Sequence, residues 1–153
     1  MIGLAQKVRS RVINMAGYSE TPLAKKLGIK EGFRIGVVNS PKGFKKELGS
    51  LPEKVKISVS DLLKPLDLII FFTDSQRTLK IEFPILAEKL SVNGMLWIAW
   101  PKKISSVSSD LSFDIVQQTG LQAGLVDVKI CAVNEIWSGL KFVYRLKDRK
   151  LQQ

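Results

Sequence analysis

Two short, almost uninterrupted apolar runs constrain the fold of this chain more than any other feature. They are Leu66–Thr73 and Met95–Trp100, and runs of this kind are typical of strands buried on both faces. Between them, apolar residues recur at the spacing of one helical face, 4, 3 and 4 residues apart: Leu79, Phe83, Leu86 and Leu90. A strand, a helix and a strand in this order indicate an α/β fold with parallel strands.

The helix between the two runs has local start and stop signals. Asp74 or Ser75 is expected to cap it, and for Asp74 this role is favoured over catalysis. Pro84 is expected to kink or restart the helix, and Asn93-Gly94 to end it.

The N-terminal half continues the alternation of helices and strands. Thr21–Gly28 predicts a short helix with a proline near its start and a glycine stop. Arg34–Asn39 predicts a buried strand, after which Ser40-Pro41 is expected to begin a helix that ends near Gly49. Val55–Ser60 alternates apolar and polar residues and predicts a second strand.

The C-terminal half ends in a predicted hairpin. A helix is expected over 109–124, with Gly120 as a weak point inside it. Residues 126–132 and 140–146 alternate as strands, and the short link 134–138 makes them antiparallel neighbours. We therefore predict a three-layer, Rossmann-like α/β fold. Its sheet is mostly parallel, has about six strands and ends in an antiparallel hairpin.

The length of 153 residues indicates one domain, which we place at 17–147. Residues 1–16 are expected to be a flexible basic extension, with Met15 as a second start site, and 148–153 a flexible tail. No apolar run approaches the roughly 18 residues of a membrane span, and no secretory signal is recognisable. These features predict a cytoplasmic protein that does not bind membranes.

Composition excludes several kinds of chemistry. Histidine is absent, which excludes Ser-His-Asp and Cys-His mechanisms and histidine-ligated metals. The single Cys131 excludes internal disulfides and Cys-x-x-Cys sites, and it is expected to pack rather than react. The net charge of +10 favours an anionic partner without saying which one.

The candidate site follows from the predicted topology. In an open α/β sheet the ligand crevice lies outside the carboxyl ends of the strands. Four turns are expected to meet there, after Val38, Phe72, Ile98 and Val133. Their polar, charged and aromatic residues are the candidate ligand-binding residues: Asn39, Ser40, Lys42, Gly43, Asp74, Trp100, Lys102, Lys103, Glu135 and Trp137.

These residues suit an anionic or phosphate-bearing ligand. A helix that starts at Pro41 would direct the free backbone N–H groups of residues 42 and 43 toward an anion. Lys42, Lys102 and Lys103 would add positive charge to the same place.

The two tryptophans leave two interpretations open. Trp100 or Trp137 could stack on a ligand ring or a cation. Alternatively, the two indoles pack together and close the edge of the sheet, with Lys102 and Glu135 as an ion pair of little energy.

The second half of the sequence resembles the class I S-adenosylmethionine-dependent methyltransferases. The residues that carry the resemblance are the 66–70 strand, the helix that ends at Leu90, and the strand of 93–98, followed by a reversed last strand. The resemblance covers about half of the chain. It implies a Rossmann-like fold and S-adenosylmethionine as a possible cofactor.

The chain is also similar to a small bacterial family of unknown function. The matching stretches span most of 16–146 and lie at 16–19, 21–30, 100–103, 124–129 and 137–141. This resemblance implies a grouping and no activity.

The cofactor determinants of a methyltransferase are reduced in this sequence. The loop after the first strand, 38–43, keeps only Gly43 of the expected glycines, and Pro41 removes a backbone donor. Asp61 is the only candidate for the acid that meets the cofactor ribose. About six residues, 61–66, connect two strands that were expected to be parallel, where a crossover normally needs a dozen or more. The second strand is therefore very short or irregularly placed.

Three functions remain open from the sequence. The favoured one is a non-catalytic or vestigial methyltransferase-like domain that binds an anionic small molecule or a protein partner. The alternatives are an active S-adenosylmethionine-dependent methyltransferase with an atypical cofactor loop, and a nonspecific nucleic-acid binder, for which no motif is present. No catalytic residue and no metal ligand is predicted. The free edge of the strand at 55–60 would allow a homodimer through strand pairing.

Overall fold

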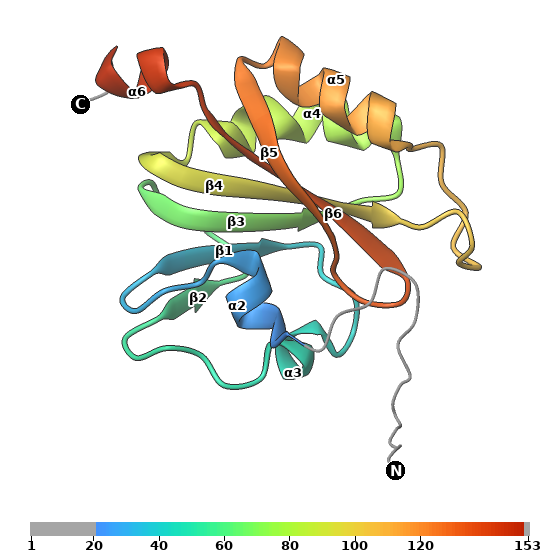
Figure 1. The fold of residues 1–153 in the computed structure, drawn as a ribbon, viewed down its shortest axis with the longest axis horizontal. Coiled ribbons are helices and arrows are strands. Elements are labelled where there is room, and N and C mark those ends of the chain that lie inside the picture. Colours follow the sequence, from blue (N-terminus) through green and yellow to red (C-terminus); the bar gives the residue numbers. More distant parts are fainter. Residues whose placement is uncertain (1–20, 152–153) are drawn as a thin grey trace.

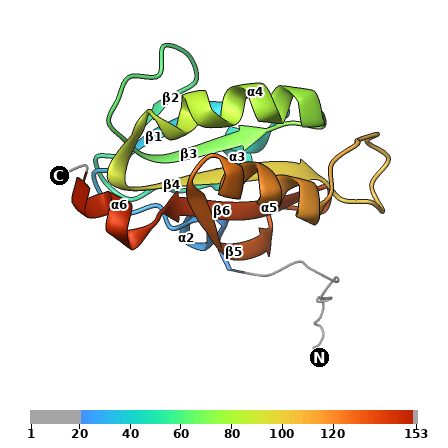
Figure 2. The ribbon, with the colours of Figure 1, turned by 90° about the horizontal axis from the view of Figure 1, so that it is seen from above.

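The structure is a computed structural model that describes residues 21–151. A central six-stranded sheet carries helices on both faces (Figure 1 and Figure 2). The strand order is β2-β1-β3-β4-β6-β5. The strands are β1 Arg34–Val38, β2 Lys56–Ser58, β3 Leu66–Phe72, β4 Leu90–Pro101, β5 Leu125–Ala132 and β6 Trp137–Tyr144. The predicted Rossmann-like α/β fold is confirmed.

Strand direction brings four chain turns to one edge of the sheet. β2, β1, β3 and β4 are parallel, whereas β6 is antiparallel to β4 and to β5. β5 therefore runs parallel to β4. The turn after β4 meets the hairpin tip directly, because the backbone N–H of Lys102 donates to the carbonyl of Ile136 at 2.7 Å. The expected common edge is confirmed.

Two apolar cores lie on the two faces of this sheet. The helices are α2 Leu23–Leu27, α3 Phe44–Leu48, α4 Gln76–Ala87, α5 Phe113–Gln122 and α6 Leu146–Leu151. The first core contains buried residues of α4 and α5, and the second contains buried residues of α2 and α3. The layers therefore follow the order helix pair, sheet, helix pair.

β3 contributes to both cores, which explains its nearly continuous apolar sequence. Ile69 and Phe71 belong to the α4–α5 core, and Leu68, Ile70 and Phe72 belong to the α2–α3 core. All five are at most 2% exposed. A strand buried on both faces has few positions for polar side chains, and in β3 the exception is Asp67 near its start, which is half-buried and accepts from the Arg34 N–H at 2.8 Å.

The strand β2 is only three residues long, which explains the short connection to β3. Its register with β1 ends where Ser58 lies beside Gly36, before the end of β1. The chain then returns past β1, and Leu62 covers Gly36 so closely that an added Cβ would lie 3.0 Å from its Cδ2. A short β2 was one of the two predicted solutions. The homodimer through this edge remains a prediction.

The boundaries of α4 and β4 correct one prediction. Asn93-Gly94 does not end the helix, because α4 ends at Ala87 and both residues lie inside β4. The register between β3 and β4 is irregular between Leu66 and Leu68. A Cβ at Gly94 would lie 2.8 Å from the carbonyl oxygen of Leu66. Glycine is needed here because two backbones approach closely, not because the chain turns.

Helix ends agree with the sequence in part. Ser75, not Asp74, caps α4 through a 3.2 Å bond from the Thr78 N–H, and α4 continues through Pro84. α5 begins at Phe113 with Ser112 as its cap, later than expected. The helix α6 was not foreseen.

The predicted extension over residues 1–16 lies outside the described residues. Within residues 21–151, no helix has the length and apolar character needed to cross a lipid bilayer.

Candidate functional site: the carboxyl rim

We call the turns at the carboxyl ends of β1, β3, β4 and β5 the carboxyl rim; they comprise residues 39–43, 73–75, 102–103 and 133–136. Figure 1 shows these strand ends at the same side of the sheet. Nine of the ten predicted ligand-binding residues lie in the rim or next to it; the tenth, Trp100, is buried near the end of β4.

The turn after β1 is fixed by its own side chain. Asn39 has a φ of +57°, a left-handed conformation that asparagine tolerates better than most residues. Its side-chain Nδ2 donates to the carbonyl of Phe72 at 2.8 Å. The bond ties the end of β1 to the end of β3.

The rest of this turn is exposed but is not a helix terminus. Ser40, Lys42 and Gly43 are exposed, and the helix begins only at Phe44. The prediction of a helix start at Pro41 is therefore wrong, because the φ of +89° at Gly43 separates the turn from α3.

The Asn134 side chain attaches the hairpin tip to α3 by hydrogen bonds. Asn134 Oδ1 accepts from the backbone N–H groups of Ile136 and Trp137, each at 2.9 Å. Its Nδ2 donates to the Glu47 carboxylate, at 3.0 Å to the nearer oxygen. One asparagine thus shapes the tip and fastens it across the rim.

Aromatic rings pack beneath the hydrogen bonds of Asn134. The ring of Phe72 lies edge-on to Trp137, with centroids 5.2 Å apart, and edge-on to Phe44 at 4.8 Å. Trp137 is half-buried and packs against the α2–α3 core. The indole closes the sheet end above Phe72 from one side.

The two tryptophans do not meet. Trp100 pairs with Ser138 and Trp137 with Pro101, and successive residues of a strand point to opposite faces. Trp100 is 5% exposed and belongs to the α4–α5 core. The expectation that both indoles converge on the rim is wrong, and so is the alternative that they pack together.

Lys102 is the rim cation with a perturbed environment. Burial lowers the pKa of its ammonium group, the nearby charge of Lys26 lowers it further, and Glu135 raises it. The charge of Glu135 thus acts favourably on Lys102, and the expected ion pair between the two side chains remains a prediction. An anion beside Lys102 would relieve its repulsion with Lys26.

The remaining candidates are exposed on the rim. Lys103 and Glu135 are exposed in the turns after β4 and β5. Asp74 is exposed after β3, and its backbone carbonyl accepts from the Ser109 hydroxyl at 2.9 Å. Within residues 21–151, no three cysteine or acidic side chains gather as a metal site would require.

A second set of lysines lies beyond the rim. Lys26 Nζ donates to the carbonyl of Ala132 at 2.8 Å, and Lys129 Nζ donates to the carbonyl of Lys26 at 3.4 Å. These bonds fasten α2 to β5. Burial raises the pKa of the Cys131 thiol, and the charges of Lys26, Lys129 and Lys141 partly oppose this effect.

Comparison with known proteins places this architecture. Solved structures of methyltransferases superpose on most of the chain, including an S-adenosylmethionine-dependent methyltransferase from Aquifex aeolicus. Its TM-score is 0.56 at 15% identity, over 78% of this chain and 86% of the other. The fold is that of the class I methyltransferases.

Two further structures share this methyltransferase fold. A TehB-like S-adenosylmethionine-dependent methyltransferase from Corynebacterium glutamicum gives a TM-score of 0.54 at 12% identity, over 85% and 91% of the two chains. Fibrillarin from Aeropyrum pernix, solved with natively bound S-adenosyl-L-methionine, gives 0.53 at 14% identity, over 83% of this chain and 70% of the other.

Sequence comparison does not assign the chain to a family. No family model matches the sequence, and no curated protein matches it. The similarity to a small bacterial family therefore remains a prediction.

Two determinants of the site were missed from the sequence. The hydrogen bond from the Ile136 N–H to Asn134 could have been predicted locally, because asparagine commonly accepts from a backbone N–H two residues ahead. The contribution of Lys26 has none, since α2 meets β5 only after the chain has folded. Asp61, the candidate ribose acid, lies with a φ of +53° in the β2–β3 connection beyond Ser58.

Proposed function

We propose that this chain is a non-catalytic domain of methyltransferase fold that binds an anionic ligand at the carboxyl rim. The observation that carries the proposal is the turn after β1. A methyltransferase brings backbone close to its cofactor at this place, whereas here the Asn39 side chain crosses to the Phe72 carbonyl and Pro41 has no N–H.

The reduced β2 supports the same conclusion. A three-residue strand followed by a short return to β3 leaves out a second αβ unit. The adenosine side of a cofactor would lose much of its wall with that unit. A domain that keeps the sheet but lacks this wall is suited to binding something else.

The charge of the rim indicates the ligand class. Lys42 and Lys103 are exposed, and Lys102 is half-buried with a lowered pKa. These three lysines outnumber the rim carboxylates Asp74 and Glu135, and the excess of positive charge favours a phosphate- or carboxylate-bearing molecule.

Calorimetry with S-adenosylmethionine and, separately, pyrophosphate tests the proposal. We expect no heat with S-adenosylmethionine at about 1 mM, which corresponds to no useful affinity. With pyrophosphate we expect binding. In NMR spectra it should change the chemical shifts of the backbone amides of Ser40, Lys42 and Lys103.

Matched lysine variants locate the binding. Lys102→Met should weaken pyrophosphate binding at least about fivefold, a loss in the range of one charge-assisted contact. Lys56→Met, at the amino end of β2, should leave it unchanged. Micromolar binding of S-adenosylmethionine together with methyl transfer to any acceptor would refute the proposal.

An active methyltransferase is the second candidate, favoured by the fold and by the exposure of the 39–43 turn. It requires Asn39 to release Phe72 when the cofactor enters. Crystals soaked with S-adenosylmethionine would then show density over Asn39–Gly43. Empty density at millimolar cofactor counts against this candidate.

A further inference from the structure

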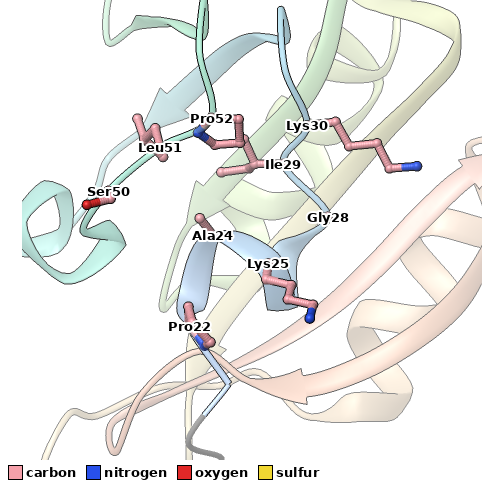
Figure 3. Close-up of a pocket in the computed structure, with 9 residues that line it drawn as sticks. All are labelled: Pro22, Ala24, Lys25, Gly28, Ile29, Lys30, Ser50, Leu51 and Pro52. Atoms are coloured by element: carbon pink, nitrogen blue, oxygen red, sulfur yellow. The ribbon is translucent and has the colours of Figure 1, made fainter.

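A groove lies between α2 and the segment that follows α3 (Figure 3). Its volume is about 490 Å³, which falls in the range of ligand-binding sites. The lining residues that matter here are Ala24, Lys25, Ile29, Lys30, Leu51 and Pro52. None of them belongs to the carboxyl rim.

The groove has an apolar floor and a basic side. Ala24 and Ile29 are buried beneath it at 5% and 6% exposure, and Leu51 and Pro52 form a wall. Among residues 21–151, no acidic side chain lines it. Figure 3 shows that Lys25 and Lys30 both extend from the side opposite Ser50 and Leu51.

The basic side continues onto the sheet. Lys129 and Lys141 are direct cross-strand partners on β5 and β6, a like-charge pairing that costs stability. The pKa of Lys141 is lowered by burial, by Lys129 and by Lys30, and raised by Cys131. Lys141 Nζ lies 5.9 Å from the centre of the Trp97 ring. Lysines therefore extend from the groove to the hairpin strands. No carboxylate of the described residues contributes to the pKa shift of Lys141.

We propose that this groove binds an acidic segment of a partner protein, with an apolar side chain of that segment on the floor and its carboxylates on the lysines. The apolar floor would supply burial, and the lysines would supply attraction and orientation. Because the binding residues are different, the proposal does not depend on ligand binding at the rim.

The lining favours a peptide over a nucleic acid. Single-stranded nucleic acids are held by aromatic side chains that stack on bases. In the described part of the chain, no ring of Phe, Tyr or Trp lines this groove, and its floor offers aliphatic surface. Aliphatic and proline side chains suit an apolar amino-acid side chain.

Selection from a random peptide phage library on the full chain tests the proposal. We expect selected peptides to combine Asp or Glu with a large apolar residue. The binding of one synthetic selected peptide is then measured by fluorescence polarisation, with a 20-nucleotide uridine RNA as competitor.

Two double variants that change the net charge equally distinguish binding in the groove from general electrostatic attraction. Lys25→Glu with Lys30→Glu should weaken peptide binding at least about tenfold. Lys45→Glu with Lys46→Glu, exposed on α3, should change it less than about threefold. Leu51→Asp should also abolish binding. Thermal unfolding confirms that each variant is folded.

Three results would overturn the proposal. One is a selection without acidic enrichment, and another is an equal loss of affinity in the two charge-reversed variants. The third is RNA that binds more tightly than the peptide and displaces it from the groove. Loss of pyrophosphate binding at the rim would leave the peptide result unchanged, so the two proposals fail separately.

Discussion

At the scale of single residues, Gly120 shows why a poor helix former can be required inside a helix. It lies in α5 against Phe142 of β6. A Cβ at this position would lie 2.0 Å from Cε1 of the Phe142 ring. That ring is fully buried and lies edge-on to Phe83 at 5.1 Å, so it has no room to move aside.

Gly120→Ala should therefore destabilise the protein by about 1–3 kcal/mol, although alanine is the better helix former by about 1 kcal/mol. Urea unfolding measures the effect. In a Phe142→Leu background, which makes space, the same substitution should cost much less. An equal cost in both backgrounds would contradict the packing explanation.

Lys102 gives a residue-scale prediction about pH. Its folded-state pKa is lowered, so the unfolded chain binds this proton more tightly than the folded one. The protonated lysine thus costs stability, and the cost disappears as pH rises through the lowered folded pKa toward about 10.4, the ordinary lysine value.

We expect the wild type to gain stability relative to Lys102→Met as the pH is raised from about 8 to about 10. Denaturant unfolding of both proteins across this range gives the difference. A difference that stays constant, or that moves the other way, would show that Lys102 is not perturbed.

At the scale of elements, one side chain, Asn134, both shapes the tip of the β5–β6 hairpin and bonds it to α3. Asn134 bonds to two backbone N–H groups of the tip and to Glu47 of α3. These bonds act together with the backbone bond from Lys102 to Ile136 and the ring contact of Trp137 with Phe72.

Asn134→Ala should destabilise the protein by about 1–2 kcal/mol and speed amide exchange at Ile136 and Trp137. Hydrogen exchange followed by NMR measures this. Glu47→Gln keeps an acceptor for Nδ2 and serves as the control with a small effect. Unchanged exchange in the alanine variant would mean that the tip is held by Trp137 alone.

The edge strand β5 is exposed in a way that its sequence pattern did not indicate. Val128 and Ile130 alternate as a buried face should, yet they are 54% and 55% exposed. The register irregularity between Asp127 and Lys129, and the lysine itself, blunt this edge against pairing with other chains.

At the scale of the whole molecule, positive charge is concentrated on one helical layer. α2 and α3 carry Lys25, Lys26, Lys45 and Lys46 against Glu47, whereas Arg77 and Lys80 of α4 are matched by Glu82 and by Asp114 of α5. Lys129 and Lys141 add to the positive charge on the side of α2 and α3. Repulsion among these cations opposes folding.

The melting temperature should therefore rise by a few degrees between about 20 and about 300 mM NaCl at pH 7. Differential scanning calorimetry measures the rise. In the variant Lys45→Glu with Lys46→Glu the rise should be smaller. A fall with salt would show that attractive surface pairs dominate instead.

The sequence by itself determined the layers of this protein. The apolar runs at β3 and β4 and the helical spacing in α4 are local patterns, and each records which faces of one element are buried. The hairpin was also predicted, because a short link between alternating strands allows no other neighbour. The common edge of the strand ends followed from these elements.

Only the tertiary structure decided what that edge contains. Which face a side chain takes depends on the register between strands far apart in sequence, and a shift of one residue reverses it. The register of β4 and β6 sends Trp100 and Trp137 to opposite cores. In the same way, the groove beside Lys25 and Lys30 exists only because α2 packs next to the segment after α3, a contact that no local pattern records.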